Sequence, residues 1–185
     1  MANKNFIKSI YNQAGGKPRS VDWYRRKIRE LTQPTPSQLV REGKRLKRPT
    51  FGTLNMFFYD PKTKGKLPFY DTFPLVLPIE KYENGFLGLN FHYLPIPLRV
   101  KLLDRMMDFA DDQEINERTR LDVDYRNLKR INLVKPTLKR YLTAHVRSDY
   151  RRITADEFLV AALLPVQQFK KASDLTVYRD SRSKI

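Results

Sequence analysis

The sequence predicts an α+β fold: a small antiparallel β unit over about residues 51–94, packed by C-terminal helices and preceded by a basic, partly helical N-terminal arm. Alternating apolar residues between turn signals indicate the β unit, and apolar residues at helical spacing indicate the helices. Basic side chains gather at both ends of the chain. We therefore expect an arm over residues 1–50, one α+β domain over residues 51–170 and an extended C-terminal tail over residues 171–185.

The arm is expected to contain two helices. Ser20 can cap the first, whose apolar face recurs at helical spacing at Val21, Tyr24, Ile28 and Leu31. The prolines of residues 33–36 end this helix. A second short helix is predicted over residues 37–45, in a segment that ends at Pro49.

The β unit begins at residues 53–59, where one set of side chains alternates with another: Leu54, Met56 and Phe58 with Asn55, Phe57 and Tyr59. Turn-forming residues follow, and the prolines of residues 67–78 favour edge strands over a central strand. Asn84 and Gly85 are typical of a hairpin turn, and a second alternating stretch follows up to residue 93. These signals together predict a small antiparallel sheet.

The chain beyond the β unit is predicted to be mainly helical. Pro97 suits the first turn of a helix with one apolar face, formed by Leu98, Leu102, Met106 and Phe109. An acidic loop is expected over residues 111–117, and a further helix around Tyr125 and Leu128.

Two more helices are expected near the C-terminus. Pro136 suits the start of one, which carries Leu138, Tyr141, Leu142 and His145. Thr154 and Glu157 match a capping box ahead of the apolar run at residues 158–164. The segment after residue 170 has too few apolar residues to pack alone, so we expect it to be an extended, docked tail.

The 185-residue chain has a net charge of +16, and this charge is unevenly distributed. Residues 1–50 carry 13 basic and 3 acidic side chains, residues 51–125 carry 9 and 12, and residues 126–185 carry 14 and 5. Two basic ends therefore flank a slightly acidic middle. Charge of this size repels itself unless an anionic partner is near, so the asymmetry indicates contact with nucleic acid.

Several classes of protein are excluded by composition. The chain contains no cysteine, which rules out disulfides, thiolate metal sites and a thiol nucleophile. The longest apolar runs are broken by proline or charge, so we expect no membrane partner. The first residues lack the apolar core of a secretory signal, and we therefore expect synthesis in a host cytoplasm.

Five clusters of basic residues are the strongest functional signal. Clustered lysines and arginines release the counterions that condense on DNA phosphates, which favours binding without sequence readout. The alternatives are a solvated surface or a patch that faces an acidic protein. The candidate nucleic-acid-binding residues are Arg25, Arg26, Lys27, Arg29, Lys44, Arg45, Lys47, Arg48, Lys139, Arg140, Arg147, Arg151, Arg152, Lys170 and Lys171.

No catalytic, metal or cofactor site is predicted. The two histidines, His92 and His145, lack convergent partners and are expected to be structural. Carboxylates near Asp104 and Asp60 could belong to a Mg²⁺-dependent nuclease, but a solvated acidic face is the favoured interpretation. Aromatic residues of the β region could stack on unpaired bases, although their alternation favours core packing.

Four segments resemble the DNA end protector proteins of T-even-like tailed phages. They lie at residues 57–80 (FFYDPKTKGKLPFYDTFPLVLPIE), 85–109, 145–153 and 169–185 (FKKASDLTVYRDSRSKI), so the resemblance covers most of residues 53–185. It implies a virion protein that binds the ends of packaged linear DNA and shields them from exonucleases. We identified no residue-level motif to carry over, so the candidate residues rest on charge alone.

The leading hypothesis is a non-enzymatic virion protein that binds DNA phosphates without sequence specificity and protects the ends of the packaged genome. The alternative is a structural neck, tail or baseplate protein whose basic arms bind neighbouring subunits. In both cases the expected partners include other virion proteins at head–tail or tail structures, and the expected location is the virion.

Overall fold

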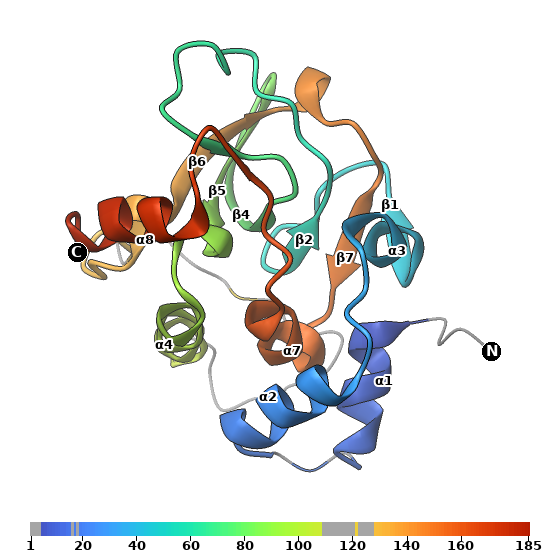
Figure 1. The fold of residues 1–185 in the computed structure, drawn as a ribbon. Helices are drawn as coiled ribbons and strands as arrows, with labels where there is room; N and C mark the ends of the chain where they lie inside the picture. The colour runs from blue at the N-terminus through green and yellow to red at the C-terminus, as the bar shows by residue number, and fades with distance from the viewer. Residues whose placement is uncertain (1–4, 16, 18, 109–120, 122–127) are drawn as a thin grey trace.

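The computed structural model describes residues 5–15, 17, 19–108, 121 and 128–185. It confirms the α+β class, because an antiparallel sheet lies on one side of the molecule and helices cover one face of that sheet (Figure 1). The predicted acidic loop at residues 111–117 and the helix around Tyr125 lie outside the described residues.

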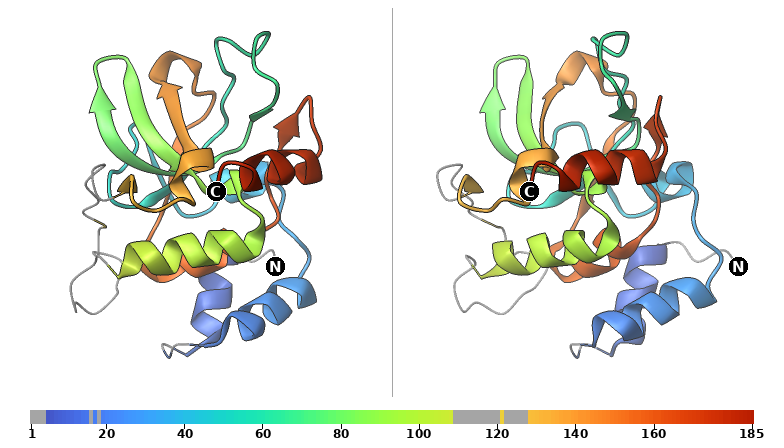
Figure 2. Two further views of the ribbon diagram at one scale, coloured as in Figure 1. Left: turned by 90° about the vertical axis from the view of Figure 1, so that its left-hand side faces the viewer. Right: turned by 60° about the vertical axis from the view of Figure 1, so that its left-hand side comes forward.

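The helices form two layers beneath the sheet (Figure 2). Helices α4 (Ile96–Met107) and α7 (Phe158–Leu163) lie next to the sheet, and α1 (Phe6–Gln13) and α2 (Val21–Glu30) pack on the far side of α7. The shorter helical elements are α3 (Pro36–Arg41), η1 (Phe91–Tyr93), α6 (Val134–Thr137), η2 (Thr143–His145) and η3 (Ala155–Glu157).

The sheet has six strands, all paired antiparallel, in the order β1-β7-β2-β4-β5-β6. The predicted β unit supplies only three strands of this sheet, β2, β4 and β5. A separate two-stranded ladder joins β3 to β8. The strands are β1 (Lys44–Leu46), β2 (Leu54–Met56), β3 (Tyr70–Asp71), β4 (Leu75–Tyr82), β5 (Gly85–Asn90), β6 (Leu138–Leu142), β7 (Tyr150–Ile153) and β8 (Phe169–Lys170).

Both faces of the sheet bury apolar side chains. On β4, Leu75 and Leu77 point to the main core with the helices, whereas Val76 points to a second, aromatic cluster. The chain after β2 folds over this second cluster, because Tyr59 bridges to Val146 in the connection between β6 and β7. The aromatic cluster comprises Phe57, Tyr59, Val76, Phe86, Tyr141 and Tyr150, so these rings of the β region pack in a core, as their alternation in the sequence favours.

The prediction of a helix that begins at Pro136 and carries residues 138–145 is wrong. Residues 138–142 form β6, which pairs with β5 from Leu89↔Leu138 to Gly85↔Leu142. The apolar residues at 138, 141 and 142 fit helical spacing, but the edge of β5 offers five consecutive strand partners that no local pattern reveals. Pro136 lies in the short helix α6 and not at the start of a long one.

The N-terminal segment is partly helical as predicted, but it packs into the main core and does not form a separate arm. Ile7, Ile10 and Leu39 are fully buried there. The helix predicted over residues 37–45 ends at Arg41, because Gly43, with φ of 73°, turns the chain into strand β1. The basic run after residue 43 therefore begins on a strand.

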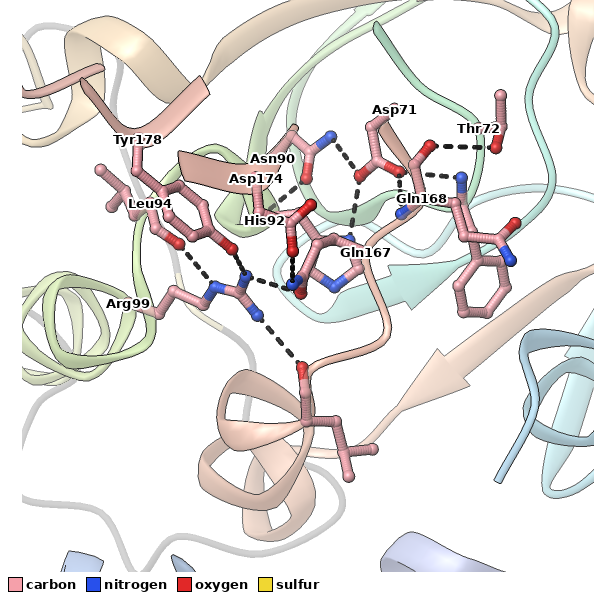
Figure 3. A network of polar contacts seen from close by, with 12 residues as sticks. Asp71, Thr72, Asn90, His92, Leu94, Arg99, Gln167, Gln168, Asp174 and Tyr178 are labelled. Atoms are coloured by element: carbon pink, nitrogen blue, oxygen red, sulfur yellow. Dashed lines mark hydrogen bonds and ion pairs between the residues drawn. The ribbon is translucent and has the colours of Figure 1, made fainter. Parts of the chain in front are cut away.

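The C-terminal segment, predicted to be extended, contains helix α8 (Asp174–Arg182), capped by Ser173. A buried polar network docks this helix (Figure 3). The fully buried Arg99 of α4 donates to the hydroxyl of Tyr178 (3.0 Å) and to the carbonyl oxygens of Leu94 (2.7 Å) and Leu164 (3.1 Å). The same guanidinium donates to Gln167 Oε1 at 2.9 Å. Arg99 thus joins α4 to the chain that follows α7 and to helix α8.

A second part of the network connects Asp71 of β3 with His92, both almost fully buried (Figure 3). The Asp71 carboxylate accepts from His92 Nδ1 at 2.9 Å, from Asn90 Nδ2 at 3.2 Å and from the backbone N–H of Phe73 at 3.0 Å. His92 therefore has a structural partner. Burial lowers the pKa of His92, so this imidazole is neutral at pH 7.

We expect the free energy of unfolding to fall as the pH drops below about 6.5, because the unfolded chain then accepts a proton that folded His92 resists. The largest slope from one such group is about 1.4 kcal/mol per pH unit. Urea unfolding at pH 7.5, 6.5 and 5.5 measures it. His92→Asn, whose amide can still donate to Asp71, should flatten the slope, and an unchanged slope would exclude His92 as its source.

Candidate nucleic-acid interface

The pairing of β1 with β7 brings together two basic runs that are distant in the sequence. Lys44 lies opposite Arg152, and Arg45 lies opposite Arg151. At the end of this ladder, Lys47 Nζ lies 2.7 Å from Asp149 Oδ1, across a separation of 102 residues. Two of the five predicted clusters therefore share the surface of the outer sheet edge, where β1 is the last strand (Figure 1), with Lys44 and Arg45 pointing to opposite sides of that edge.

We call this surface the basic edge and define it as Lys44, Arg45, Lys47, Arg48, Arg147 and Arg152. All of these side chains except Arg152 are exposed, and Arg152 is half-buried. Asp149 offsets one charge through its ion pair with Lys47, and Arg147 lies 3.7 Å from Asp60 Oδ2. Arg41, which the sequence analysis did not select, is exposed at the end of α3, three residues before β1. The edge is therefore strongly positive.

Arg151 is a correction to the predicted set, because its side chain is fully buried. Its guanidinium donates to the carbonyl oxygen of Leu39 at 2.7 Å and to Asn5 Oδ1 at 2.9 Å, and it lies 3.8 Å from Glu42 Oε2. Burial lowers the pKa of Arg151, although an arginine remains protonated at neutral pH. Arg151 holds α1 and α3 against β7 and cannot reach a phosphate.

The cluster on α2 lies apart from the basic edge, on the far side of α7 from the sheet (Figures 1 and 2). Arg25 lies 3.7 Å from Asp22, and Lys27 donates to Glu30 at 2.7 Å, so these two charges have local acidic partners. Arg26 and Arg29 are exposed. The clusters at residues 25–29 and 44–48 are close in the predicted arm, but they lie on different surfaces of the folded chain.

The remaining candidates lie around β6 and β8. Lys139 and Arg140 are on β6, the opposite outer strand of the sheet from β1, and Lys170 is exposed on β8. Lys171, with φ of 68°, uses its ammonium to donate to the carbonyl oxygens of Lys64, Gly65 and Leu67. Since these three bonds satisfy its three N–H groups, Lys171 braces the turn before residue 68.

Comparison with known proteins decides the family. Residues 4–180 match the family described as Phage T4 terminal DNA protecting protein. The chain belongs to this family. No curated protein and no solved structure matches the chain. The match extends the resemblance seen in the sequence to the N-terminal helices, which the sequence analysis had treated as a separate arm.

The acidic residues that were considered for a metal site, where the structure describes them, are not grouped as such a site would need. In the described part of the chain, Asp, Glu and His side chains form no group of three or more that could hold a metal ion. Asp60, a nuclease candidate, accepts a hydrogen bond from Lys64 at 2.8 Å, and this bond lowers its pKa. Glu42, beside the basic run that begins at Lys44, accepts from the backbone N–H of Phe6 at 2.7 Å and so also has a structural partner.

The acidic residues Asp111, Asp112 and Glu114 lie outside the described residues. None of the helices that the structure describes has the length and apolar character needed to span a bilayer. The basic edge presents fixed positive charges, which can hold phosphates in place.

Proposed function

We propose that the protein binds duplex DNA near its ends through phosphate contacts of the basic edge, without reading sequence, and thereby blocks exonucleases. It would act in the virion, bound to the packaged genome and to neighbouring virion proteins, after synthesis in the host cytoplasm. The name of the family supports DNA terminal protection, and the β1–β7 pairing is the observation that supports this surface as the binding site.

The physical reason is electrostatic. Each lysine or arginine that neutralises a phosphate releases condensed counterions, so affinity falls steeply with salt. Lys44 and Arg45 keep the fixed spacing of strand β1, and the basic run continues directly past the end of that strand. Such a set of charges contacts the backbone whatever the base sequence. Protection then requires only that the protein occupies the duplex end, so it needs no reacting group.

Neutralising the exposed charges in Lys44→Gln, Arg45→Gln, Lys47→Gln and Arg48→Gln together should weaken duplex binding and flatten its salt dependence. Four lost phosphate contacts reduce the slope of log affinity against log salt by about 3–4. The matched control replaces two exposed lysines and two exposed arginines elsewhere: Lys81, Lys101, Arg105 and Arg130. Both variants lose the same charge, so only contact at the basic edge separates them.

The measurements are duplex affinity at several salt concentrations and the survival of linear duplex against an exonuclease. We expect the edge variant to lose protection at a salt concentration where the control still protects. Equal slopes for the two variants would contradict the proposal. An edge variant that binds DNA normally but is missing from particles would instead assign the edge to a neighbouring virion protein.

A further inference from the structure

A cleft of about 480 Å³ lies between β6, the segment at residues 59–71 and helix α8. Its size falls in the range of ~300–1,000 Å³ that is typical of small-molecule sites. The cleft differs from the basic edge in composition, because aromatic rings and basic side chains line it together. This combination is the one that proteins use for unpaired nucleotides, where rings stack on bases and cations hold phosphates.

The accessible rings of the cleft are those of Phe69 and Tyr70, which are half-buried at the wall formed by the start of β3 and the residue before it. Phe69 packs near Tyr93, with ring centroids 6.0 Å apart. The face of Tyr93 is covered by Lys139, whose Nζ lies 4.1 Å from the ring centroid. A base that enters the cleft would therefore stack on Phe69 or Tyr70.

Lys139 provides the phosphate site. Its ammonium lies over Tyr93, and no hydrogen bond or ion pair to it is recorded within the part of the chain that the structure describes. Burial, and then the charge of Lys184, lower the pKa of Lys139 to about 8, against the opposing effect of Asp180. A largely buried cation without an acidic contact is costly, and an incoming phosphate would offset that cost.

The other charged groups of the cleft leave it positive. Lys62 and Arg140 line it, and Lys184 also does so while paired with Asp180. The second acidic residue, Asp71, is buried and already accepts hydrogen bonds from His92 and Asn90. Arg140 is engaged elsewhere, because it donates to Asn84 Oδ1 at 2.9 Å and its guanidinium lies over the ring of Tyr82. The cleft therefore has spare positive charge at Lys62 and Lys139.

We infer that this cleft binds the unpaired terminal nucleotide of a DNA end, with the base against Phe69 and Tyr70 and a phosphate at Lys139. The inference rests on the proposed function and adds recognition of the unpaired base at an end. The basic edge contacts phosphates, which are alike along a duplex, whereas a base can enter the cleft only where it is unpaired. Arg147 connects the two surfaces, because its partner Asp60 lies between the cleft residues Tyr59 and Pro61.

The test compares three DNAs of equal length with the full chain: a duplex with a single-stranded overhang, a blunt duplex, and a hairpin-capped duplex without ends. We expect the overhang duplex to bind about tenfold more tightly than the blunt and the capped duplexes, as stacking of one base provides. 2-Aminopurine at the terminal unpaired position should be quenched on binding, and 2-aminopurine inside the duplex should not.

Lys139→Met and Tyr70→Leu should each remove most of this end preference and leave affinity for the capped duplex unchanged. Lys139→Met should fold well, since it removes a buried charge. Lys81→Met, at an exposed position on β4, is the control and should keep the preference.

Equal affinity of the wild-type chain for the overhang and blunt duplexes would overturn the inference, and it would leave the proposed function intact where both bind more tightly than the capped duplex. A Lys139→Met chain with the full preference would also overturn it, as would free deoxyadenosine monophosphate binding as tightly as the overhang. Failure to bind all three DNAs would overturn the proposed function itself.

Discussion

Replacing Arg99 by methionine is expected to lower the free energy of unfolding by about 3–5 kcal/mol, because it leaves two buried carbonyl oxygens unsatisfied at a cost of about 1–3 kcal/mol each. The substitution removes four hydrogen bonds from a fully buried guanidinium and leaves the carbonyl oxygens of Leu94 and Leu164 without these donors. Buried polar atoms that lose their partner cost more than the bond itself contributes. The effect should extend to α8, because Tyr178 loses its contact with α4.

Urea unfolding measures the total loss, and amide hydrogen exchange of residues 174–182 measures the docking of α8. Arg105→Met is the matched control, because Arg105 lies on the same helix but is exposed, and it should change stability by less than about 0.5 kcal/mol. Equal effects of the two substitutions would mean that the buried network does not hold α8. Since Asp180 and Lys184 line the cleft, Arg99→Met should also weaken the end preference.

The parts of the fold that were predicted correctly are those with local signals. Ser20 caps α2 by accepting from the backbone N–H of Trp23, and Thr154 and Glu157 form the predicted capping box. The turn signal at Asn84 lies where β4 and β5 form a hairpin. Each of these depends on residues a few positions apart, so the sequence alone contains the physical cause.

The parts that were missed depend on partners far along the chain. β1 is a strand because β7, about 100 residues later, offers its edge, and β6 is a strand because β5 does so. The basic edge could not be predicted for the same reason, since its charges come from two separate runs. The cleft was missed because the sequence analysis assigned aromatic residues and Lys139 to different roles, and only the fold places them together.

Arg151 shows the limit most clearly, because nothing in the sequence distinguishes it from Arg152. On a strand, neighbouring side chains point to opposite faces. Arg151 shares its face with Met56, its partner on β2, and points into the core beside Leu39. Arg152 points to the other face, opposite Lys44. Charge counting treats the two arginines alike, whereas in the structure Arg151 is buried and stabilises the fold, and Arg152 lies at the basic edge.

Arg151→Met and Arg45→Met are therefore expected to change different properties, stability in the first case and DNA binding in the second, although the two residues are direct partners across the β1–β7 ladder. Arg151→Met should lower the free energy of unfolding by about 3–5 kcal/mol, since it removes the donor to Leu39 and Asn5 and leaves Glu42 without its cation. DNA binding by the Arg151→Met variant should depend on salt as steeply as DNA binding by the wild-type chain. Arg45→Met should leave stability within about 0.5 kcal/mol and reduce the salt slope by about 1.

The pair separates a specific contact surface from the effect of total charge, because each substitution removes one positive charge. If net charge alone governed binding, the two variants would lose the same affinity and the same salt slope. If the basic edge contacts phosphate, only Arg45→Met loses slope, and the comparison is valid at temperatures where Arg151→Met remains folded. Loss of slope in Arg151→Met with none in Arg45→Met would place the phosphates elsewhere on the molecule, and the cluster on α2 would then be the next surface to neutralise.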